Sequence, residues 1–234
     1  MKHHISFAPC MILGVALAGI SSARATTVFF DDFSEPANTP IFGKPADIGS
    51  SWYGFGTPPS VDAGGAFDTT GAARNAFADF TDALGPGQSI SLSFDSLPMA
   101  SGPLFASGVA GISLYFGPTE GVFVGDTFYG NTWGVDESAV GGPHLTDSPV
   151  RTASVLFTYV YDTGEWSLTV NNGSTFTLSG VGQAQEPFDN LRVANDMGGD
   201  FRVDNIKVDI SPVPEVSSLV FLIAGLPVLA RRCR

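Results

Sequence analysis

Residue types that could do catalytic chemistry are sparse in this chain. His144 is the only histidine between residues 26 and 211, and that interval has no cysteine. A zinc site of the usual kind needs several nitrogen or sulfur ligands, and a nucleophile needs a base beside it. No Gly-x-Ser-x-Gly elbow, phosphate loop or dinucleotide fingerprint occurs. The glutamates of the interval stand apart in the sequence: Glu35, Glu120, Glu137, Glu165 and Glu186. Glu165, beside Trp166, is the best lone acid among them, and we expect a protein that is not an enzyme.

Calcium is the metal that the side chains favour, because it binds carboxylate and amide oxygens. Asp31-Asp32 follows the first apolar run, and Asp204-Asn205 interrupts the last one. If those two segments are neighbouring strands, the four side chains converge. Asp196 and Asp200 form a second candidate pair. The alternative is that all of these residues are solvated strand ends and turns, with no bound cofactor.

Aromatic clusters in loop-like sequence offer a second kind of site, one for sugars. Sugars stack on exposed aromatic faces, with polar acceptors beside them. Trp52 and Tyr53 lie in one such cluster, and Trp133 follows Tyr129-Gly130-Asn131-Thr132 in another. The alternative is that these rings belong to the hydrophobic core.

The elements that would position these residues are predicted to be strands. Apolar residues alternate with polar ones in 89–95 and in 112–116, as in half-buried antiparallel strands. Residues 155–161 and 166–170 alternate around the turn Asp162-Thr163-Gly164-Glu165, and Asn171-Asn172-Gly173 leads into 174–178. We therefore expect a three-strand meander within one all-β domain that spans residues 26–211.

Three further elements are predicted with less regular patterns. The first strand is expected at 27–33, and the last at 201–210. The alternation slips at Asp204-Asn205, which predicts a β-bulge there. Apolar residues spaced by three and four between Arg74 and Leu84 indicate a short helix, although a strand and turn would fit almost as well.

The predicted domain is strongly acidic. It holds 22 of the chain's acidic residues against six basic ones, a net charge of −16. Such a surface repels nucleic acid, so no nucleic-acid partner is expected. Both cysteines, Cys10 and Cys233, lie outside the domain, so no disulfide framework supports it.

The two ends of the chain resemble targeting segments. Residues 1–25 combine a basic start, an apolar run and the small-x-small sequence from Ala23 to Ala25, which predicts a cleaved secretory signal peptide. An N-terminal anchor helix is the alternative. At the other end, an apolar run over 219–230 precedes Arg231, Arg232 and Arg234. Arginines of this kind stay at the cytoplasmic side of a membrane.

The last segment, 212–234, resembles the PEP-CTERM sorting signal of secreted bacterial proteins. Val213, Pro214 and Glu215 match its motif, and the apolar run and arginine cluster follow in the same order. The resemblance implies recognition by a membrane-embedded exosortase after passage through the secretion machinery. It also implies cleavage near the motif, with the product at the cell surface or outside the cell. The alternatives are an ordinary membrane anchor and a buried last helix.

The predicted domain itself resembles the antiparallel β-sandwiches, or jelly rolls, of the concanavalin-A and laminin-G-like group. The similar stretches are 111–115, 121–125, 162–168, 189–193 and 203–208. Glucanases of this fold class carry their acids as Glu-x-Asp-x-x-Glu or Glu-x-Asp-x-Glu on one strand, and neither run occurs here. The resemblance implies a β-sandwich between an N-terminal signal helix and a C-terminal sorting helix.

The sequence thus predicts an exported, non-catalytic surface or matrix protein that associates with exopolysaccharide. A polysaccharide hydrolase or lyase on the same fold is one alternative. A structural coat protein with no small ligand is the other.

Overall fold

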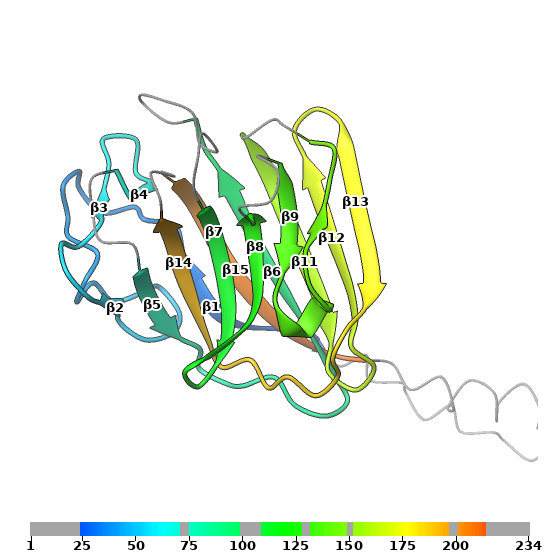
Figure 1. The fold of residues 1–234 in the computed structure, drawn as a ribbon. Coiled ribbons are helices and arrows are strands. Elements are labelled where there is room, and N and C mark those ends of the chain that lie inside the picture. Colours follow the sequence, from blue (N-terminus) through cyan, green and yellow to red (C-terminus); the bar gives the residue numbers. More distant parts are fainter. Residues whose placement is uncertain are drawn as a thin grey trace, which may run out of the picture.

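Two antiparallel sheets pack face to face in the computed structural model (Figure 1). The structure describes residues 24–70, 75–98, 109–127, 132–148, 152–196 and 201–213. None of these residues forms a helix long and apolar enough to cross a membrane. The prediction of an all-β antiparallel sandwich is confirmed.

The larger sheet has eight strands in the order β13-β12-β11-β6-β15-β4-β3, with β1 also paired to β15. Their bounds are β1 (Thr26–Asp31), β3 (Ser60–Val61), β4 (Phe67–Asp68), β6 (Gln88–Ser96), β11 (Ala153–Val160), β12 (Glu165–Asn171), β13 (Thr175–Val181) and β15 (Arg202–Pro212). The predicted meander is present as β11, β12 and β13, which pair in sequence order.

The smaller sheet has seven strands in the order β10-β9-β8-β7-β14-β5-β2. Their bounds are β2 (Tyr53–Gly54), β5 (Asn75–Asp79), β7 (Val109–Phe116), β8 (Thr119–Asp126), β9 (Trp133–Asp136), β10 (His144–Leu145) and β14 (Asn190–Asp196). A 3₁₀ turn, η1 (Ser138–Val140), follows β9.

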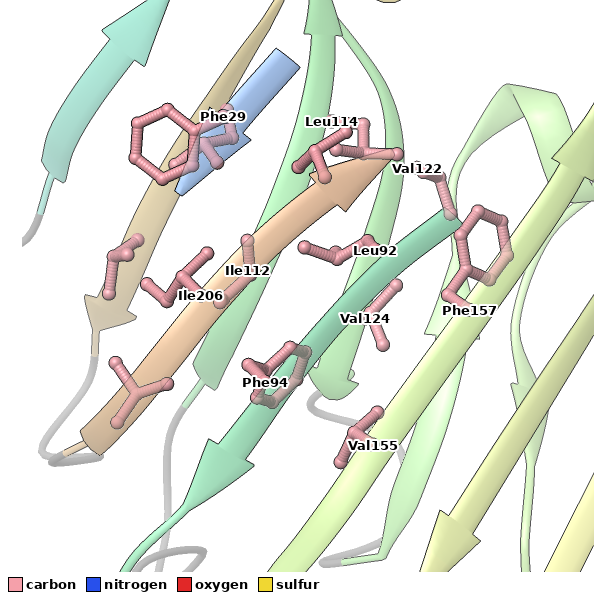
Figure 2. Packing of buried hydrophobic residues seen from close by; sticks show 14 of the residues in the cluster. Phe29, Leu92, Phe94, Ile112, Leu114, Val122, Val124, Val155, Phe157 and Ile206 are labelled. Carbon is pink, nitrogen blue, oxygen red and sulfur yellow. The ribbon is translucent and has the colours of Figure 1, made fainter. Parts of the chain in front are cut away.

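The core lies between the two sheets and is built by alternation along the strands. Leu92 and Phe94 of β6 face Ile112 and Leu114 of β7, and Phe157 of β11 lies among them (Figure 2). These side chains are at most 2% exposed. Burial of one such side chain contributes about 1.5–3 kcal/mol, so this layer stabilises a domain that has no disulfide.

The first and last strands of the domain are neighbours, as the calcium prediction required. β1 pairs antiparallel with β15, and Asp31 lies opposite Ile206. The register of β15 against β6 shifts between Asp204 and Lys207, and Asn205 takes a positive φ of 52°. The predicted β-bulge is therefore confirmed.

The helix predicted between Arg74 and Leu84 is wrong where the structure describes it. Residues 75–79 form β5, which pairs with β14 on one side and β2 on the other. Ala76 and Ala78 point into the core while Phe77 points out, which is a period of two. Pairing on both sides outweighs a weak helical spacing.

Most of the targeting residues lie outside the described part of the chain. This holds for Ala23 in the predicted cleavage site, and for Pro214, Glu215, Arg231, Arg232 and Arg234 in the tail. Ala25 is exposed just before β1. The backbone N–H of Val213 donates to the carbonyl of Gly87 at 2.8 Å. The described part of the chain therefore ends beside the residue that precedes β6.

Candidate functional site

An aromatic row crosses the outer face of the smaller sheet. Tyr53 of β2 lies opposite Phe77 of β5, and their rings stack 5.6 Å apart with an interplanar angle of 16°. The Phe77 ring also meets the edge of Tyr115 of β7 at 5.7 Å. Because the neighbours of Phe77 along β5 are buried alanines, alternation turns the Phe77 ring outward. Three strands therefore supply one aromatic platform.

The aromatic platform lines an open hollow of about 380 Å³. Its lining residues are Tyr53, Phe55, Phe77, Tyr115, Gly117, Pro118 and Asn190. Phe55 is 76% exposed and Tyr53 is 44% exposed, so ring surface is available to a ligand. A hollow of this size with apolar walls and a few polar groups is typical of a small-ligand site.

Hydrogen bonds hold the platform in place. The Tyr53 hydroxyl donates to Asp79 Oδ1 at 2.8 Å, and Asn190 Nδ2 donates to the carbonyl of Gly117 at 3.1 Å. Burial and the bond to Asp79 raise the pKa of Tyr53 to about 12. Tyr53 is therefore a neutral hydroxyl at any physiological pH.

A charged cluster adjoins the platform on the same face. Arg192 of β14 lies opposite Ser113 of β7, and its Nη2 is 2.6 Å from Glu120 Oε1. The Ser113 hydroxyl donates to the same carboxylate oxygen at 2.5 Å. The Arg192 guanidinium also lies over the Tyr115 ring, 5.2 Å from its centroid. Glu120 is thus a carboxylate that Arg192 and Ser113 hold in one position.

Glu137 lies beside this cluster, close enough for its charge to interact with those of Glu120 and Arg192. Burial raises its pKa, and the charges of Glu120 and Asp136 raise it further against the opposing effect of Arg192. Its backbone has φ 87° and ψ −179°, a region that essentially only glycine occupies without strain. Strained backbone and raised carboxyl pKa values are both enriched at functional sites.

Glu120 and Glu137, which stand apart in the sequence, are neighbours in the fold. Sheet pairing brings them close enough for their charges to interact, although 16 intervening residues separate them along the chain. Glu165, the acid favoured by the sequence, begins β12 in the other sheet and is exposed. No short motif marks this pair, because its members come from β8 and from the residue after β9.

The two tryptophans predicted as sugar platforms are core residues. Trp52 is 1% exposed and Trp133 is 0% exposed, so neither offers a face to a ligand. Trp52 is enclosed by Phe29, Phe33 and Phe67, with ring centroids 5.5–6.0 Å away. Of the predicted sugar-binding residues, only Tyr53 lies on the surface.

Asp31, one of the predicted calcium ligands, is paired with a buried lysine. Both of its oxygens lie 2.8 Å from the Lys44 ammonium, and Oδ2 also accepts the Trp52 indole N–H at 2.6 Å. The Asp31 side chain is fully buried. Lys44 therefore already supplies a cation to Asp31, and calcium binding by Asp31 stays a prediction.

The other three predicted ligands gather at one end of β1 and β15. Burial raises the pKa of Asp204, and the charges of Asp95 and Asp32 raise it further. Asn205 Nδ2 donates to Asp95 Oδ2 at 3.1 Å. Asp32 also lies beside Asp31 and Asp47, with carboxylate oxygens within 4.8 Å of one another. Oxygen ligands of the kind calcium prefers are thus present, and calcium binding by Asp32, Asp204 and Asn205 stays a prediction.

No known family model matches the chain, and no curated protein matches it. Solved structures of similar shape include an endo-1,3-β-glucanase from Streptomyces sioyaensis, 14% identical over 85% of this chain and 100% of the other, with a TM-score of 0.48. A lectin from Bauhinia forficata in complex with GalNAc is 11% identical over 82% of this chain and 100% of the other, with a TM-score of 0.42. The exoplasmic/lumenal domain of VIP36, bound to Ca²⁺ and mannose, is 11% identical over 77% of this chain and 91% of the other, with a TM-score of 0.45.

These low scores describe shared architecture and carry no functional conclusion by themselves. They do correct one expectation from the sequence, namely that the protein is not an enzyme. One of the similar structures is a glucanase, which contradicts that expectation, and the missing sequence motif on which the expectation rested is not enough to exclude an enzyme.

Proposed function

We propose that this protein is exported to the cell surface or its surroundings and binds polysaccharide on the outer face of the smaller sheet. The observation that carries the proposal is the aromatic platform of Tyr53, Phe77 and Tyr115, which lies beside the Arg192–Glu120 pair and is open to solvent at Tyr53. Sugar rings present an apolar face and a rim of hydroxyls. The stacked rings suit the face, and the carboxylate and guanidinium suit the rim.

Removing the platform tests the binding proposal. Migration through gels that contain 1,3-β-glucan, mannan or the host's own exopolysaccharide measures affinity without requiring a pure oligosaccharide. We expect Tyr53→Ala and Phe77→Ala each to weaken binding at least about tenfold, which corresponds to about 1.4 kcal/mol. Leu156→Ala is the matched control, because Leu156 is 42% exposed on the larger sheet. Equal retardation of all four proteins by a polysaccharide would place its binding elsewhere.

A second function on the same face is hydrolysis of the bound polysaccharide, and the environment of Glu137 favours it. Glycoside hydrolysis needs one carboxyl that is protonated near the working pH and a second that stays ionised. Glu137 has the raised pKa, and Arg192 is paired with Glu120. We expect the release of reducing ends to fall as the pH rises. Glu137→Gln should abolish this release and leave polysaccharide binding intact. If the wild-type protein binds the polysaccharide but releases no reducing ends, the hydrolysis proposal is wrong and a lectin-like binding role is left.

The route to the surface is the second part of the proposal. We propose that secretion removes residues 1–25 and that an exosortase cleaves near Val213-Pro214-Glu215. Before cleavage the apolar tail would hold the protein in the membrane. Intact mass of the protein from culture fluid and envelope of its native host tests this. We expect a product without either end, whereas an intact tail in the membrane fraction would point to a permanent anchor.

A further inference from the structure

The strand β13 is an unprotected sheet edge, unlike the other edges of the described structure. The larger sheet ends at β3 and the smaller one at β2 and β10, and each of these strands has only two residues. The six-residue β1 also pairs with one strand only, but on its other side Phe30 bridges Ile48 and the carbonyl of Val28 accepts the Thr81 N–H. β13 has seven residues, all paired with β12 on one side (Figure 1). Very short edge strands are a common protection against unwanted pairing, and charges or prolines are another. β13 has neither charge nor proline.

The core side of β13 is incompletely covered. Phe176 and Leu178 point inward, opposite Val170 and Leu168 of β12, yet they are only partly buried. The facing edge of the smaller sheet ends in the two-residue β10, which leaves these side chains at the open side of the sandwich. On the outer side, Val181 is 70% exposed. An added strand would cover apolar surface as well as satisfy the free backbone edge.

The absence of charged side chains around β13 favours a second copy of this acidic chain as the partner at this edge. Residues 171–185 contain no charged side chain, in a domain whose net charge is −16. Two copies repel each other at most orientations, and an uncharged contact avoids like charges directly opposite one another. The strand is also self-complementary. An antiparallel pair centred on Leu178 places Thr177 opposite Ser179 of the second copy and Phe176 opposite Gly180, where no side chain competes for space.

We propose that β13 joins two copies of this chain about a two-fold axis at Leu178, forming one continuous sheet across the dimer. Each copy then presents its own aromatic platform, so the dimer offers two sites to one polysaccharide chain. The dimer does not depend on the polysaccharide proposal, because its contact lies on the other sheet.

Sedimentation velocity of the full chain over a wide concentration range tests the contact. The wild-type chain should sediment as a dimer. The double variant T177D/S179D places aspartates opposite each other across the axis and should give a monomer. The variant T177D/S179K places an aspartate opposite a lysine and should restore the dimer. T57D/T70D is the matched control, since Thr57 and Thr70 are exposed near the opposite edge of the sandwich. It should remain dimeric.

Several outcomes would overturn the proposal. A monomeric wild-type chain is one, and a dimer that survives T177D/S179D is another. A chain that becomes dimeric only when residues 214–234 are deleted would show that its own tail covers β13. Far-UV circular dichroism of each variant checks that loss of the dimer is not loss of the fold. Failure of T177D/S179K to recover the dimer would exclude the two-fold register and point to a different partner strand.

Discussion

Single side chains decide where chemistry is available in this protein. Asp31 is a fully buried carboxylate, and it is tolerated because Lys44, Trp52 and the backbone N–H of Phe33 all donate to it. Burial alone would lower the pKa of Lys44, but its bonds to Asp31 and Glu35 outweigh that effect and raise it. The contrast with Glu137 is clear. Asp31 has a full set of hydrogen-bond partners, whereas Glu137 has a strained backbone and two neighbouring carboxylates whose charges Arg192 only partly offsets.

We expect Lys44→Met to destabilise the fold by about 3–5 kcal/mol, because it leaves a buried charge without its counter-ion. Lys44→Arg should cost less, since it keeps a cation near Asp31. Urea denaturation followed by circular dichroism measures both. Equal stability of Lys44→Met and the wild-type protein would mean that Asp31 can take a proton or water at little cost.

The strained backbone of Glu137 should lower the stability of the fold, and substitutions at this position test this. Glu137→Gly should raise the unfolding free energy by about 1–3 kcal/mol, because glycine adopts this φ and ψ without strain. Glu137→Gln keeps the strain and removes the charge. Because the folded-state pKa of Glu137 is raised, its ionised form disfavours folding above the usual value of 4.5. The gain from Glu137→Gln should therefore appear at pH 7 and vanish below about pH 4, as thermal melts at the two pH values would show. Destabilisation by Glu137→Gly would mean that the strain is absent.

At the scale of elements, glycines set how closely β7 and β8 approach. Gly111 of β7 lies opposite Gly125 of β8, and the Phe123 ring lies within 2.7 Å of where a Cβ on Gly111 would be. A Cβ on Gly125 would collide with the carbonyl oxygen of Ala110 and lie 2.7 Å from the Gly111 Cα. This close approach supports the register that places Ser113 and Tyr115 on the outer face. The geometry of the candidate site thus depends on backbone as well as on side chains.

Gly125→Ala should therefore destabilise the protein by more than about 2 kcal/mol, because backbone atoms cannot move aside as a flexible side chain can. Gly85→Ala is the control, since its Cβ would meet only Gln88 Oε1 at 3.5 Å. That variant should stay within about 0.5 kcal/mol of the wild-type protein. Urea midpoints with unchanged slopes would compare the two. A Gly125→Ala protein as stable as Gly85→Ala would mean that the β7–β8 pair can separate slightly at no cost.

At the scale of the whole molecule, the excess of acidic residues works against compactness. A domain with net charge −16 repels itself, and added salt screens this repulsion. We expect the melting temperature to rise between low ionic strength and about 0.15 M sodium chloride, where the Debye length is about 8 Å. The same salt should strengthen association of two copies. Magnesium or calcium chloride at equal ionic strength is the control, and an extra rise with calcium alone would indicate a specific site.

The class of fold and the three-strand meander could be predicted from local sequence patterns. Strict alternation in 89–95 and 155–170 allows only half-buried strands, and the phase slip at Asp204-Asn205 requires an extra residue in the ladder. These are local properties, since the side-chain period and the turn residues are read from neighbouring positions. The contact between the first and last strands, by contrast, was only a condition of the calcium hypothesis, and the pairing of β1 with β15 meets it.

The residues of the candidate site could not be predicted from the sequence, because contacts between distant strands bring them together. Three features depend on which strands become neighbours in the fold. They are the burial of Trp52 and Trp133, the pairing of Asp31 with Lys44, and the approach of Glu120 to Glu137. Phe77 shows the reason most directly. Its spacing in the sequence suggested a short helix, but pairing of β5 between β14 and β2 makes it a strand residue whose ring points outward beside Tyr53. Register is set by long-range hydrogen bonds, and no short stretch of the chain contains that information.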